Sequence, residues 1–187
     1  MTILIEFIKY FTPILTFSAG IYAAPFIERR KEARVIKEKI KSIQNEISDE
    51  YKIIIKSIYS TDKSIKMRIG KPEGYKYLSL PMALNLRLTA NNLDHVYAYV
   101  TEDKRKAFKV LLLCQKTITE YHNQIEGEYK NNNILCLAKE KAMLKSMLSA
   151  YYLLNALTTN WDTFSYPKNS NHEIWEIAAK SLNITLV

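Results

Sequence analysis

The chain has 187 residues, of which 48% are hydrophobic and 25% are charged, and its formal net charge at pH 7 is +8. Only four glycines occur, and no segment alternates apolar and polar residues as a half-buried strand does, so the composition argues against a sheet-rich fold. Three scattered histidines and two distant cysteines argue against a zinc site. We therefore predict an all-α protein without a metal or cofactor.

The first distinctive segment is the uncharged run 10–27, which is eighteen residues long. That length lies at the lower end of what crosses a bilayer as a helix. Six basic and three acidic residues follow at 28–39, whereas only Lys9 and the terminal amine are positive before the run. Because basic residues flank membrane helices on the cytoplasmic side, we predict a transmembrane anchor at 1–27. It would cross a bacterial inner membrane once, with the N-terminus outside and the bulk of the chain in the cytoplasm.

Two other interpretations of this run stay open. A cleaved signal peptide would begin with a basic region, whereas here an acid precedes the single base, and a cut after Ala24 would leave Pro25 first. A buried helix of a soluble domain would not need the dense basic segment that follows, which fits a headgroup boundary of anionic lipid. The residues that we expect to contact anionic lipid are Arg29, Arg30, Lys31, Arg34 and Lys37.

On an ideal helix, the small and polar residues of the anchor gather on one side and most large apolar residues on the other. Small residues four positions apart let two helix backbones approach closely, and threonine hydroxyls can bond across the contact. We therefore predict that several copies pack through this stripe or line a pore with it, and a passive anchor is the alternative. The small-residue stripe consists of Glu6, Lys9, Thr12, Thr16, Gly20 and Ala24.

After Pro25 the pattern becomes that of a long amphipathic helix, which we expect to form a stalk at 28–60. Its apolar residues are spaced 4, 3, 4, 4, 3 and 4 positions apart, close to an eleven-residue repeat. This isoleucine stripe must be covered, either by sister subunits in a coiled coil or by the downstream helices. It consists of Ile36, Ile40, Ile43, Ile47, Tyr51, Ile54 and Ile58.

A basic loop is expected at 61–78, where Gly70, Pro72 and Gly74 break helices. A small cytosolic helical bundle is expected to follow at 79–187, which is long enough for a core of its own.

Four helices are expected in this bundle from apolar spacing and cap residues. The first starts near 79–81, and the second spans 101–127. The third spans 134–159 after the asparagines at 131–133, and Asn171 caps a short last helix.

The closest approach to a catalytic pattern is an arginine followed by a histidine. Helical nucleases of the HEPN type carry an arginine, four to six further residues and then a histidine. Here Arg87 and His95 enclose seven residues, which departs from that pattern. The arginine would hold the phosphate and the histidine would transfer a proton. We expect no enzyme, and a helical ribonuclease stays as an alternative. Cys114 and Cys136 stand in apolar contexts and are expected to be core thiols.

Basic residues beyond the lipid-proximal segment have two interpretations. They are solvated helix surface, or they form a site for an anionic ligand such as RNA or a signalling nucleotide. The tyrosines, which could stack on bases, are spread along the chain. The candidate ligand residues are Lys63, Lys66, Arg68, Lys71, Lys104 and Arg105.

These features predict a membrane protein that oligomerises through its membrane helix and stalk, and whose bundle responds to a protein, RNA or nucleotide trigger. In architecture and size alone, the chain resembles the small membrane-anchored helical effectors of bacterial antiviral systems, which damage the inner membrane when triggered. The resemblance implies a membrane-perturbing or pore-forming effector. A passive membrane tether for a protein or RNA partner is the competing prediction.

Overall fold

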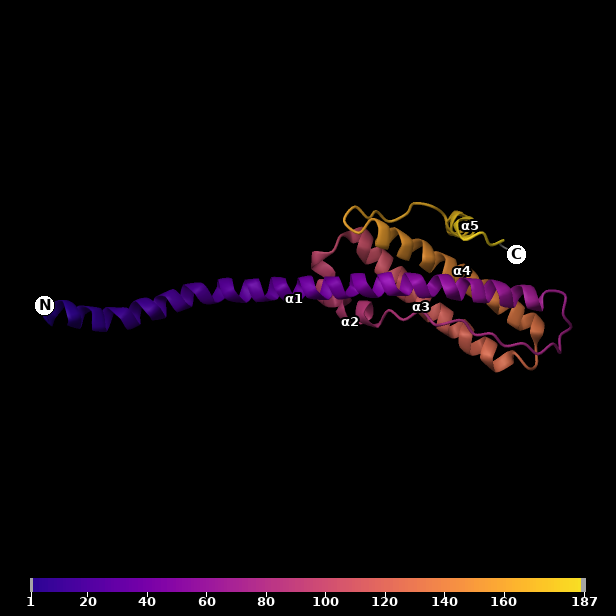
Figure 1. The fold of residues 1–187 in the computed structure, drawn as a ribbon, viewed down its shortest axis with the longest axis horizontal. Helices are drawn as coiled ribbons and strands as arrows, with labels where there is room; N and C mark the ends of the chain where they lie inside the picture. Colours follow the sequence, from indigo (N-terminus) through magenta and orange to yellow (C-terminus); the bar gives the residue numbers. More distant parts are fainter. Residues whose placement is uncertain (1, 186–187) are drawn as a thin grey trace. The chain divides into compact units, whose positions relative to one another are not determined.

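The computed structural model describes the backbone of residues 2–185 and the side chains of residue 12 and residues 16–185. No strand occurs among the described residues, so the prediction of an all-α fold is confirmed. The chain divides into two units, the first up to Lys41 and the second from Ser42 onward. The helices are α1 (Thr2–Arg68), α2 (Arg87–Val96), the short 3-10 helix η1 (Tyr97–Tyr99), α3 (Glu102–Glu128), α4 (Asn133–Thr159) and α5 (Asn171–Ser181) (Figure 1).

The second unit is a helical bundle whose core includes the last part of α1. The α1 isoleucines at 43, 47, 54, 58 and 65 are at most 1% exposed. Tyr51 stacks on Tyr151 of α4 with ring centroids 5.7 Å apart, while α4 also packs against α3 and α5. From Ile43 onward the isoleucine stripe is therefore covered by the chain's own downstream helices, which answers the question that the sequence left open for that part of the stripe.

Helix α1 continues past the start of the loop that was expected at 61–78. It does so because Ser64 and Arg68, which are polar in sequence, are buried and bonded to α4. Gly70 follows the last turn with a φ of 73°, the left-handed conformation that commonly terminates helices and that glycine adopts without a steric penalty. The non-helical connection thus begins later than expected, after Arg68, and it also ends later, at Leu86.

Helix α2 begins at Arg87, later than the start expected near 79–81. The carboxylate of Glu46 on α1 accepts hydrogen bonds from the backbone N–H groups of Leu88 and Thr89 at 2.6 and 2.7 Å, and from the Thr89 hydroxyl at 2.7 Å. A carboxylate there satisfies donors that a helix N-terminus leaves unpaired and complements the helix dipole. The start of α2 is therefore capped by a residue on another helix.

The three remaining helices begin close to their predicted starts because local residues cap them. The Thr101 hydroxyl accepts a hydrogen bond from the backbone N–H three residues on at 3.4 Å, and the Asn132 side chain does the same at 2.8 Å. At α5 the cap is Ser170 and not Asn171, since Ser170 and Glu173 form a reciprocal capping box.

Candidate functional site

Helix α1 presents large apolar side chains on its surface between residues 17 and 27. Full burial of one such side chain stabilises by roughly 1.5–3 kcal/mol. Contact of these exposed side chains with an apolar surface would therefore be strongly favourable. Among the described residues, no helix holds a stretch both long and apolar enough to cross a membrane. We call these side chains the apolar band: Phe17, Ile21, Tyr22, Phe26 and Ile27, with exposed fractions between 52 and 76%.

The residues predicted to contact anionic lipid follow the apolar band directly, and all of them are exposed: Arg29, Arg30, Lys31, Arg34 and Lys37. Arg34 pairs with Glu38 one turn later at 3.1 Å, and a pair as exposed as this one adds little stability. The surface of α1 therefore changes within a few residues from apolar to cationic.

The small-residue stripe lies partly within the described side chains. The Thr16 hydroxyl donates to the backbone carbonyl of Thr12 at 2.8 Å, so its oxygen keeps lone pairs for a donor on a neighbouring helix. Apart from its two neighbours and the nearby backbone of its own helix, a Cβ added at Gly20 would meet nothing within 4 Å. Glu6 and Lys9 lie outside the described side chains. The described members, all exposed, are Thr12, Thr16, Gly20 and Ala24.

The six candidate residues for an anionic ligand fall into two groups at opposite ends of α4. Lys63 and Lys66 are exposed on α1, Lys66 being paired with Asp62 at 2.6 Å, and Lys71 follows the end of that helix. Lys104 and Arg105 lie in the first turn of α3. Arg68 contacts the start of α4, and Lys104 contacts Trp161 just past its end. The 27 residues of α4 span about 40 Å, so the two groups do not form a common site.

Arg68 belongs to a buried network and is 0% exposed. Its guanidinium donates to the carboxylate of Glu140 and to the side-chain oxygen of Asn133, both at 2.9 Å, and to the carbonyl of Tyr77. Burial raises the pKa of Glu140, and hydrogen bonds from Ser64 and Arg68 oppose that rise. Arg68 therefore joins α1 to α4 inside the bundle, which corrects its prediction as a surface ligand for an anion.

The basic residues at the start of α3 adjoin aromatic rings. The Lys104 amine lies 4.8 Å from the ring centroid of Trp161, and Arg105 and Lys109 lie 4.7 and 5.2 Å from that of Tyr97. Tyr97 precedes α3 and Trp161 follows α4. Because the two rings are far apart in the sequence, the sequence did not predict that both lie beside the basic residues of α3. We call these five residues the basic–aromatic cluster.

Arg87 and His95, the residues of the nuclease alternative, lie in the first and last turns of α2, and both are exposed. Because His95 is eight positions after Arg87, the two residues are about 12 Å apart along the helix axis and about 80° apart around it. Their side chains therefore do not converge as a catalytic pair would, and no observation favours the nuclease.

Both cysteines are buried and unpaired. Burial raises the pKa of the Cys114 thiol to about 11 and also raises that of Cys136, which makes both thiols poor nucleophiles. No group of three histidine, cysteine, aspartate or glutamate side chains gathers as a metal site in the part of the chain that the structure describes.

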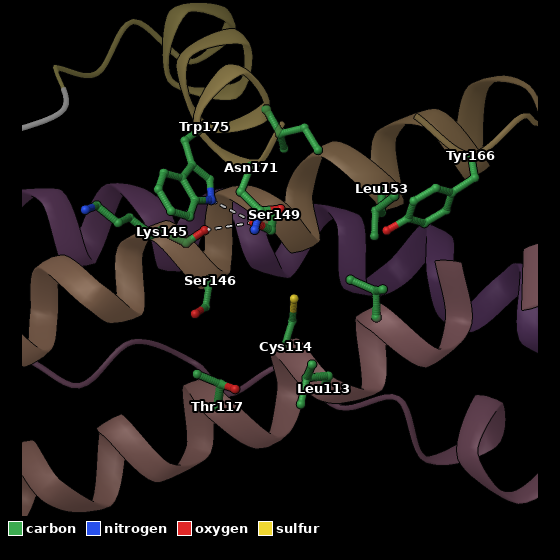
Figure 2. A pocket seen from close by; sticks show the side chains of 12 residues that line it. Leu113, Cys114, Thr117, Lys145, Ser146, Ser149, Leu153, Tyr166, Asn171 and Trp175 are labelled. Carbon is green, nitrogen blue, oxygen red and sulfur yellow. Dashed lines mark hydrogen bonds between the residues drawn. The ribbon is translucent and has the colours of Figure 1, made fainter. Parts of the chain in front are cut away.

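A cavity of about 230 Å³ opens between α3, α4 and α5, and we call it the α3–α5 pocket (Figure 2). Thr117 and Cys114 lie on its α3 side, Lys145 and Ser149 come from α4, and Trp175 comes from α5. The indole N–H of Trp175 donates to the Ser149 hydroxyl at 2.8 Å, while the Lys145 amine lies 5.1 Å from the indole centroid. These contacts hold the indole at one wall of the pocket.

No local pattern in the sequence indicates this pocket. Its lining residues are spread from Val110 to Trp175, and it is formed only when α5 packs against α4 and α4 against α3. Comparison of the chain with protein-family models, with curated proteins and with solved structures found no match.

Proposed function

We propose that this protein acts at a membrane, with the N-terminal part of α1 inserted in an anionic bilayer and the bundle on the cytoplasmic side. The observation that carries the proposal is the direct succession of the exposed apolar band and the exposed basic residues 29–37. Burial of the band would supply on the order of 10 kcal/mol. Each basic residue near an anionic surface would add about 1 kcal/mol.

The same part of α1 would hold copies of the protein together. From residue 43 onward the isoleucine stripe is used inside the bundle, so it is not available to sister subunits there. The small-residue stripe remains for self-association, because Thr12, Thr16, Gly20 and Ala24 leave room for a second backbone. Glu6 and Lys9 would pair across the same interface.

The proposed activity is a change of membrane permeability that the cytosolic bundle controls. A protein, RNA or nucleotide trigger acting on the bundle would rearrange the assembly and loosen or open the bilayer. This is the behaviour expected from the architectural analogy with antiviral effectors.

Flotation of the full-length protein with vesicles tests the membrane role. Vesicles with an anionic lipid should carry more protein to the top of the gradient than zwitterionic vesicles. Arg29→Gln with Arg30→Gln should reduce the difference, whereas Lys116→Gln with Lys130→Gln, which removes two exposed charges of the bundle, should not. Equal recovery of protein at the bottom of the gradient with and without vesicles would contradict the proposal.

A passive tether for an RNA or protein partner is the second candidate. The basic–aromatic cluster favours it through Arg105 and Lys109, which lie beside the exposed ring of Tyr97, because such an arrangement is suited to phosphates and stacked bases. Lys104 is buried against Trp161 and is not available to such a partner. Dye leakage from vesicles distinguishes the two functions. Leakage caused by the intact protein supports the effector, and vesicle binding without leakage in the presence of added RNA supports the tether.

A further inference from the structure

We propose that the α3–α5 pocket binds a small organic anion with a flat apolar body, such as an aromatic carboxylate. The pocket lies wholly in the second unit, and the membrane function proposed above does not use it.

The polar groups of the pocket offer donors and a positive charge. No aspartate or glutamate lines the cavity, whereas Lys145 does. Within the described residues, the Lys145 amine has no carboxylate at ion-pair distance, and the hydroxyls of Thr117 and Tyr166 make no hydrogen bond. The exposed Lys145 ammonium lies beside the indole of Trp175 on one side of the cavity, and Tyr166 lies on the other (Figure 2). The negative group of a ligand is therefore expected at the Lys145 ammonium, while the two hydroxyls offer further donors to acceptors elsewhere on the ligand.

The rest of the pocket is suited to a flat apolar body. Leu113 and Leu153 contribute aliphatic walls, and the indole of Trp175 contributes an aromatic one (Figure 2). Ile174 also lines the cavity. A cavity of roughly 150 Å³ is known to accept benzene, so about 230 Å³ accommodates one ring with a short substituent. The Cys114 thiol stays neutral because burial raises its pKa to about 11, so it does not repel an anion.

The first experiment follows the fluorescence of Trp175 during a titration of the full-length protein with benzoate. The chain has two tryptophans, so Trp161→Phe leaves Trp175 as the single reporter. Benzoate should change the emission saturably in roughly the millimolar range, which is reasonable for so small a ligand. Benzamide, which has the same shape without the charge, should bind far more weakly. No saturable change, or equal responses to benzoate and benzamide, would overturn the proposal.

The second experiment removes the charge from the pocket in the same reporter background. Lys145→Met keeps most of the apolar stem and should weaken benzoate binding by about tenfold or more, since it removes a charge-assisted contact. Lys139→Met is the matched control, because Lys139 is also on α4 and also lies near a ring, that of Tyr121 at 5.8 Å, but outside the pocket.

Circular dichroism first checks that both methionine variants keep the helical content of the parent protein. If Lys145→Met loses it, Thr117→Val decides instead, by removing one hydroxyl from the opposite wall of the pocket. Unchanged benzoate affinity in the folded Lys145→Met protein, or in Thr117→Val where that variant decides, rejects the pocket as an anion site. Equal weakening by Lys139→Met also rejects it, because the effect would then come from overall charge.

Discussion

Arg68 and Glu140 form an ion pair of 2.9 Å between side chains that are 0% and 1% exposed, and they join two helices across 72 residues of sequence. The network also includes Asn133, which donates to the backbone carbonyls of Arg68 and Lys71. A buried pair of this kind gains little over apolar packing, but the loss of one partner leaves a buried charge uncompensated. The pair therefore links α1 to α4, and removal of either partner alone should destabilise the bundle.

The first prediction concerns this pair. Arg68→Met should lower the free energy of unfolding by about 3–5 kcal/mol, because Glu140 then stays buried without its cation. Replacing both residues, as Arg68→Met with Glu140→Leu, should cost clearly less than the sum of the single changes. Urea unfolding followed by circular dichroism measures the parent, the two single variants and the double variant. Lys52→Met, which breaks an exposed pair with Asp49 on the same helix, should change stability by less than about 1 kcal/mol. Additive losses in the double variant would contradict the pairing.

The sequence predicted the helices well where the signals were local. The isoleucine stripe indicated one continuous amphipathic helix, and Thr101 and Asn132 marked helix starts that the structure confirms to within a residue. The prediction that Arg68 is a surface ligand was wrong because no residue near Arg68 in the sequence indicates that Glu140 pairs with it inside the bundle. The start of α2 was missed for the same reason, since its cap comes from Glu46.

The candidate sites also differ in whether they depend on local sequence or on contacts between distant residues. The basic residues after the apolar band could be named from the sequence, because their meaning depends on their neighbours along one helix. The α3–α5 pocket could not, because Thr117, Lys145 and Trp175 come together only through the packing of three helices. The same holds for Tyr97 and Trp161, which approach the basic residues of α3 from two different connections.

The second prediction tests the cap that α1 supplies to α2. Glu46→Ala should lower the free energy of unfolding by about 1–2 kcal/mol, the upper range for the loss of a helix cap. Amide hydrogen exchange should accelerate at Leu88 and Thr89, whose N–H groups lose their acceptor. Asp49→Ala is the control, since Asp49 is an exposed acid on the same helix that pairs with Lys52 at 3.5 Å. Unchanged exchange in the first turn of α2 would show that this cap is dispensable.

The third prediction is a pH dependence centred on Glu50. Burial raises the pKa of Glu50 above its ordinary value of 4.5, the backbone N–H of Asn85 opposes that rise, and the charges of Glu46 and Asp49 add to it. A carboxyl with a raised pKa binds its proton more tightly in the folded than in the unfolded chain. Its contribution to stability is therefore present below pH 4.5 and falls as the pH rises through the folded-state pKa.

Glu50→Gln removes this titration while keeping an oxygen that can accept from Asn85. The free energy of unfolding of Glu50→Gln minus that of the parent should therefore increase between pH 4 and pH 7. Urea unfolding of both proteins across that range measures the difference. A constant difference, or one that decreases with rising pH, would show that the pKa of Glu50 is not raised in the folded protein.

The fourth prediction concerns self-association through the small-residue stripe. Gly20→Leu should reduce the mass of the detergent-solubilised assembly and abolish dye leakage, because the added side chain separates two helices that would otherwise meet at their backbones. Apart from its two neighbours and the nearby backbone of its own helix, a Cβ at Gly20 meets nothing within 4 Å, so the bundle should unfold as it does in the parent protein. Any loss of assembly then reports a contact between chains.

Ser18→Leu is the matched control, because it places the same side chain on the opposite side of the helix. Analytical ultracentrifugation of the three proteins separates the outcomes. If Gly20→Leu keeps the parent mass, or if Ser18→Leu loses it equally, the stripe is not the surface that joins the copies.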